Sequence, residues 1–208
     1  MRRKRLSRRL RGAVALAGCA VVLVAAQLVV SAVAPSAAAE QWTLNALMAE
    51  LAKTHSGSVR YREERHLKAM TEPVVITGTM AYEAPDRLVK IALTPHKETM
   101  VIEGDNLTIE RAGGVGPQSL KLSEIPELNT LITAIRGTLL GDRKALERAF
   151  EVRLSGARTA WSMELKPRAG SKRWANLQIT VSGAGGRPAR FEIRQPDGDR
   201  IVVQVLDK

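Results

Sequence analysis

The chain has 208 residues, of which 45% are hydrophobic and 25% charged, a composition that excludes wholesale disorder. The formal net charge of +11 does not indicate nucleic-acid binding, because seven of the 32 basic residues and none of the acidic residues precede Glu40. The one cysteine, Cys19, also lies before Glu40, so the remainder carries no disulfide, thiolate nucleophile or cysteine metal site.

The N-terminal segment has the order of a secretory signal peptide. Residues 2–11 are basic, residues 12–34 are almost wholly apolar, and the small residues 37–39 follow. We therefore expect residues 1–39 to be a signal peptide and residues 40–208 to form one domain exported to the periplasm. The alternative is an uncleaved membrane anchor, because an apolar stretch of this length can span a bilayer.

The exported part begins with a predicted helix over residues 42–54, in which the leucines and methionine form one apolar stripe. Glu63 and Arg65 then interrupt the apolar face of a strand. Glu63 and Glu64 lie among Arg60, Arg62 and Arg65, so we expect cross-strand ion pairs there, and the alternative is an acidic site. Alternation of apolar and polar residues predicts strands at 59–67, 74–82, 88–93, 99–103 and 107–109.

The middle of the chain changes from a period of two to a helical period. A glycine-rich loop at 112–117 and a strand-like segment at 119–122 precede apolar residues spaced three and four apart over 125–139. Gly141 ends this predicted helix, and a second, short helix runs to Ala149. Five further strands are predicted around residues 150–154, 161–165, 177–181, 191–193 and 201–205.

This order predicts an α+β fold that is mainly β. Short strands joined by tight turns favour a single, strongly curved antiparallel sheet, an incomplete β-barrel of about 10–11 strands. The N-terminal helix and the mid-chain helices are then free to cover the concave face, the latter as a lid.

No pattern of residues indicates catalysis. The three histidines, His55, His66 and His96, are too far apart in the sequence to share a turn or a strand face. The nucleophile motif Gly-x-Ser-x-Gly does not occur. We therefore predict no enzyme activity, no metal and no cofactor; a hydrolase with an unrecognised site is the remaining enzymatic alternative.

The apolar faces of the sheet and helices allow two interpretations. They can form an ordinary core, or the helices can cover the sheet loosely and leave a cavity for a ligand. An aliphatic lining with few polar groups suits acyl chains better than sugars or nucleotides. In the second interpretation the cavity and lid residues are Tyr61, Ile76, Met80, Leu128, Ile132, Ile135, Trp161 and Met163.

In the order and spacing of its elements, the chain over residues 42–206 resembles the LolA-type outer-membrane lipoprotein carriers. The similar segments are the helix at 47–51 that leads into the strand at 58–61, the glycine, aromatic and proline stretch at 78–88, and the hairpin at 101–109. The resemblance implies an incomplete antiparallel barrel with a helical lid over an apolar cavity. It also implies a monomeric carrier that receives acyl chains of a lipoprotein from an inner-membrane complex and delivers them to an outer-membrane acceptor.

Two positions depart from the pattern of the family that the chain resembles. The family carries an arginine before the proline that ties down the lid, and this chain has Ala84 there. The family also carries an exposed aromatic residue beyond that proline, at a partner-binding position that is Leu88 here. The cargo can therefore be a related lipid or glycolipid. The alternative function is a non-transporting sensor or scaffold of the same fold that binds lipid or protein.

Overall fold

The computed structural model describes residues 42–168 and 176–206, which all belong to one unit spanning Ala39–Lys208. The predicted signal peptide, residues 1–39, lies outside the described residues. Within the described part, no helix combines the length and the apolar character that crossing a bilayer requires.

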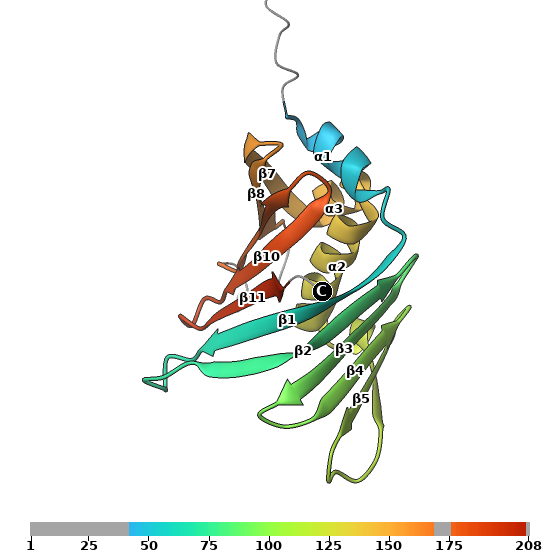
Figure 1. Ribbon diagram of the computed structural model, residues 1–208, viewed down its shortest axis with the longest axis vertical. Helices are drawn as coiled ribbons and strands as arrows, with labels where there is room; N and C mark the ends of the chain where they lie inside the picture. Colours follow the sequence, from blue (N-terminus) through green and yellow to red (C-terminus); the bar gives the residue numbers. More distant parts are fainter. Residues whose placement is uncertain (1–41, 169–175, 207–208) are drawn as a thin grey trace, which may run out of the picture. The chain divides into compact units, whose positions relative to one another are not determined.

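Eleven strands form one sheet in the order β6-β5-β4-β3-β2-β1-β11-β10-β9-β8-β7 (Figure 1). All neighbouring strands are antiparallel, which confirms the predicted mainly-β α+β fold, whereas the curvature of the sheet stays a prediction. The strands are β1 (Ser56–His66), β2 (Val74–Glu83), β3 (Arg87–Thr94), β4 (Glu98–Glu103), β5 (Asn106–Arg111), β6 (Gln118–Lys121), β7 (Phe150–Ala157), β8 (Ala160–Pro167), β9 (Gln178–Ala184), β10 (Arg187–Arg194) and β11 (Arg200–Leu206).

Three α-helices accompany the sheet: α1 (Leu44–Leu51), α2 (Pro126–Leu140) and α3 (Arg143–Ala149), with a short 3-10 turn η1 (Leu122–Glu124) before α2. The side chain of Thr43 caps α1 by accepting a hydrogen bond from the Ala46 N–H. The helix α1 is shorter than the predicted 42–54 because Ser56 already pairs with Glu83 in the sheet.

The side chains of one face of the sheet, here called the inner face, pack against the helices. Along β1 this face carries Tyr61, Glu63 and Arg65, because side chains alternate between the two faces of a strand. Tyr61 pairs with Gly78 on β2 and with Val205 on β11, so these two residues lie on the same face.

The inner face holds two separate buried cores. The first core joins α1 and α3 to the strands β7, β8 and β9, and it includes Leu47, Leu146, Trp161 and Met163. The second core joins η1 and α2 to β4 and β5 and consists of Ile102, Leu107, Leu122 and Ile132. The helix α2 contributes Ala134 to the first core and Ile132 to the second, so it bridges the two across the central strands.

Candidate functional site

The predicted cavity residues fall into three places. Trp161 and Met163 lie in the first core, where they are 2% and 0% exposed. The lid residues Leu128, Ile132 and Ile135 belong to the second core or pack against it. Tyr61, Ile76 and Met80 lie between, on β1 and β2, and belong to neither core. The structure therefore does not bring all eight residues together around one space.

The central strands carry a strip of half-buried apolar side chains between the two cores. Ile76 and Met80 on β2 stand on the inner face, opposite Glu63 and Val59 of β1. On the other side of β1, Val203 and Val205 stand opposite Glu63 and Tyr61. We call Ile76, Met80, Ile201, Val203 and Val205 the central strip. All five are half-buried, unlike the fully buried residues of either core.

A cluster of charged residues adjoins the central strip. The carboxylate of Glu63, 2% exposed, accepts a hydrogen bond from Arg65 Nε at 2.5 Å and forms an ion pair with Lys90. The Lys90 ammonium also lies 5.2 Å from the centroid of the Tyr61 ring, a cation–π contact. Of the ion pairs of Glu63, only the one with Lys90 is a cross-strand pair as predicted, and Lys90 comes from β3, which is not a neighbour of β1 in the sheet; the pair with Arg65 lies within β1.

The small residues of β2 and β3 leave room for this contact. Lys90 lies on β3 and Glu63 on β1, so the lysine side chain crosses β2. Gly78 stands opposite Tyr61 on one side and Ala92 on the other, and it presents no side chain at the crossing. A Cβ on Gly78 would lie 1.8 Å from the Ile91 carbonyl oxygen, so only glycine fits there.

The ionisation of this cluster follows from burial and charge. Burial raises the pKa of Glu63, but Lys90 and Arg65 outweigh it and hold the pKa below its usual value. Burial, with a smaller effect from the Glu63 charge, raises the pKa of Tyr61 to about 12. At neutral pH the cluster therefore holds one carboxylate, two cations and a neutral phenol. That phenol oxygen is buried and has no hydrogen-bond partner in the described structure.

Side-chain hydrogen bonds at two places hold η1 and α2 to the sheet. Asp105, in the β4–β5 turn, accepts hydrogen bonds of 2.8 Å from both the backbone N–H and the hydroxyl of Ser123 in η1. Arg136 of α2 donates to the backbone carbonyl of Asp86 in the β2–β3 turn, one residue beyond Pro85. The sequence analysis did not predict this contact of Arg136, because every residue has a backbone carbonyl and the sequence does not indicate which one accepts the bond.

The two positions that depart from the LolA-type pattern lie beside this second contact. Ala84 is the first residue of the same turn, and its backbone N–H bonds to the His55 carbonyl at 2.8 Å. Leu88, the predicted partner-binding residue, is half-buried; it pairs with Ile102 and packs against the second core. Its side chain therefore contributes to the packing of the sheet against η1 and α2.

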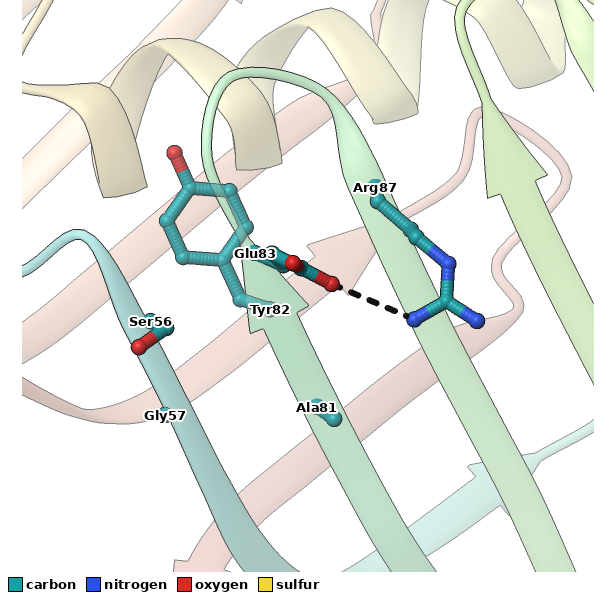
Figure 2. Close-up of a pocket in the computed structure, with 6 residues that line it drawn as sticks. All are labelled: Ser56, Gly57, Ala81, Tyr82, Glu83 and Arg87. Carbon is teal, nitrogen blue, oxygen red and sulfur yellow. Dashed lines mark hydrogen bonds and ion pairs between the residues drawn. The ribbon is translucent and has the colours of Figure 1, made fainter.

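A pocket of about 350 Å³ lies near the start of β1, lined by Ser56, Gly57, Ala81, Tyr82, Glu83 and Arg87 (Figure 2). None of the predicted cavity residues lines it. Figure 2 shows Glu83 directed toward Arg87, with which it forms an ion pair of 3.5 Å, and the Tyr82 ring extending away from both. The charges of this pocket balance each other, and the described residues hold no group of three or more potential metal ligands there or elsewhere.

Comparison with known proteins identifies a family. The family model described as outer membrane lipoprotein carrier protein LolA-like matches residues 32–204. Among curated proteins, no significant match is found.

Three solved structures are similar to the chain at low sequence identity. A LolA superfamily protein of Nitrosomonas europaea is 12% identical, with a TM-score of 0.43 and coverage of 79% of this chain and 92% of that chain. A DUF1329 family protein of Desulfovibrio piger is 8% identical, with a TM-score of 0.44 and coverage of 78% and 88%. MucB, crystallised in complex with MucA(peri), is 14% identical, with a TM-score of 0.38 and coverage of 77% and 53%.

With TM-scores this low, the three structures add nothing to the assignment, which rests on the family model. That match covers most of the chain, including all eleven strands up to residue 204 and all three helices. The chain belongs to the family of LolA-like outer membrane lipoprotein carrier proteins.

Proposed function

We propose that the protein is a periplasmic carrier that binds acyl chains of a lipoprotein, or of a related lipid or glycolipid, and takes them from the inner to the outer membrane. The observation that carries the proposal is the central strip. Its five apolar side chains stay half-buried on the face that the helices cover, while the cores on either side are closed.

Binding of an acyl chain would be driven by the removal of exposed apolar surface from water. Each buried CH₂ of an acyl chain contributes about 0.8 kcal/mol, and half-buried side chains gain further burial when a ligand covers them. Two cores that are already packed keep the sheet folded, so the central strip can open and close without unfolding the domain. The helix α2 bridges both cores and is the element that would move to admit a chain.

Binding and release in this proposal involve no covalent chemistry. The one carboxylate of the charged cluster, Glu63, is engaged by two cations. The energy for directional transfer would come from differences in affinity between donor complex, carrier and acceptor. Membership of the LolA-like family supports this direction of transfer.

A matched pair of variants on β2 tests the binding surface. Met80 lies on the inner face and Thr79 beside it on the opposite face, and both are half-buried. We expect Met80→Glu to abolish displacement of a fluorescent fatty acid, because a charge would replace an apolar contact, and Thr79→Glu to leave it unchanged. Equal loss in both folded variants, or no fatty-acid binding by the wild type, would contradict the proposal.

A transfer assay separates a carrier from the sensor or scaffold alternative. Protein loaded with a radiolabelled acylated peptide is mixed with acceptor vesicles, and the label in each fraction is measured. A carrier releases the peptide to the vesicles, whereas a sensor retains it. Retention under conditions in which the fatty acid binds reversibly would favour the sensor.

A further inference from the structure

The inner face of the sheet carries a surplus of positive charge. In the described strands its charged residues are Glu63, Arg65, Lys90, Glu98 and Arg111. Glu98 and Arg111 pair at 2.6 Å and cancel. Glu63 can cancel only one of its two cationic partners, so one positive charge is left over beside the central strip.

The two cations are accessible, whereas the carboxylate between them is not. The side chains of Lys90 and Arg65 are 25% and 41% exposed, against 2% for Glu63. In the described part of the chain Glu63 is the one ionic partner of each. An ammonium has three donors and a guanidinium five, so both keep donors for a further acceptor.

The surplus charge and the apolar surface are adjacent. Lys90 pairs in register with Met80, and Arg65 pairs with Ile201, both members of the central strip. A neutral acyl chain on this strip would shield the cations from water without compensating them, which is costly. An acyl chain that ends in an anion would supply the missing charge where it is needed.

We infer that the cargo carries an anionic headgroup, a carboxylate or a phosphate, which Lys90 and Arg65 bind while its acyl chain lies on the central strip. The inference rests on the proposed carrier function and narrows it. It favours acidic lipids and glycolipids over lipoproteins whose lipid anchor is uncharged. Glu63 acts as a positioning residue, because it holds both cations at the strip without contacting the cargo.

The test compares dodecanoate and dodecyl phosphate with neutral dodecyl maltoside, each below its micellar concentration, by displacement of a neutral fluorescent acyl probe. We expect the two anions to bind about tenfold more tightly than the maltoside, as for one charge-assisted hydrogen bond. Equal affinities for all three would overturn the headgroup inference and leave the carrier proposal intact. Failure of every compound to displace the probe would contradict both.

Variants then locate the effect. Changing Glu63, Arg65 and Lys90 all to Gln removes the surplus charge without leaving a buried ion unpaired. We expect this triple variant to bind all three compounds alike. The control Arg62→Gln with Glu64→Gln removes an ion pair from the opposite face of β1 and should keep the preference for anions. If the triple variant does not fold, Arg65→Gln alone replaces it, because this change removes the surplus charge and leaves Glu63 paired with Lys90. A preference for anions that is undiminished in a folded variant would overturn the assignment to this cluster.

Discussion

The guanidinium of Arg136 donates a hydrogen bond of 2.6 Å to the backbone carbonyl of Asp86. This contact joins the lid helix α2 to the β2–β3 turn. In the LolA-type pattern that the sequence resembles, an arginine of the turn holds the lid, and here Ala84 occupies that position. In this tether the arginine lies on α2 and the acceptor lies in the turn.

Removing this donor should make the lid open more readily. We expect Arg136→Met to speed the association of a fluorescent fatty acid about tenfold or more, since a hydrogen bond from a charged donor contributes about 1.5–3 kcal/mol. Stopped-flow fluorescence measures the rate. Asp86→Asn is the matched control, because it keeps the carbonyl that accepts the bond. An unchanged association rate in Arg136→Met would show that the contact does not limit entry.

A second change should restore the tether from the other side. In the Arg136→Met background, Ala84→Arg places a guanidinium in the turn, as in the pattern of the family. We expect it to slow fatty-acid association again, because arginine can donate several hydrogen bonds to the carbonyls of the lid. Rates that stay as fast as in Arg136→Met alone would mean that residue 84 does not correspond to the family's arginine.

Gly141 closes α2 at a point where no other residue fits. Its φ is 64°, and a Cβ there would lie 2.1 Å from the Met48 carbonyl oxygen of α1. We expect Gly141→Ala to lower the free energy of unfolding by about 3 kcal/mol or more, measured by urea denaturation. Gly185→Ala is the control, because φ is 52° with open space around it, and it should cost only about 1–2 kcal/mol. If both variants lost the same unfolding free energy, the close approach of Gly141 to α1 would contribute nothing to the effect of Gly141→Ala.

Ile132 distinguishes a packed lid from a lid over open space. It is 5% exposed and lies in the second core with Ile102 and Leu107. We expect Ile132→Glu to destabilise the domain by about 3 kcal/mol or more, because the charge would be buried without a partner. Thr133→Glu, at a half-buried neighbouring position, should cost much less in thermal melting. A stable Ile132→Glu protein that has lost fatty-acid binding would place a ligand cavity at this residue instead.

Acid should weaken the fold partly through Glu63. Its folded pKa lies below the unfolded value of 4.5, so its stabilisation is complete above pH 4.5 and is lost as the pH falls through the folded pKa. We expect Glu63→Gln to flatten the dependence of the unfolding free energy on pH below 4.5. Glu64→Gln on the exposed face should flatten it less, because solvent screens that ion pair. If the unfolding free energies of the wild type and of Glu63→Gln changed with pH in parallel, this role of Glu63 would be contradicted.

The sequence by itself determined the elements and their order. Alternation of period two located the strands from β1 to β11, and the seam of period 3.6 located α2, because these periods follow from backbone geometry. Gly141 marked the end of α2 by a positive φ, a local backbone conformation that favours glycine. The family resemblance followed from the same order, and the family model confirms it.

Only the tertiary structure decided which of these residues meet. A one-dimensional pattern showed Glu63 and Arg65 as interruptions of an apolar face. The register then placed Lys90 two strands away, within reach of Glu63 across Gly78. Likewise, periodicity gave Ile132 and Trp161 the same apolar character, but they lie in different cores. The tether from Arg136 to Asp86 depends on a backbone carbonyl, and every residue carries one, so only the folded chain could select it.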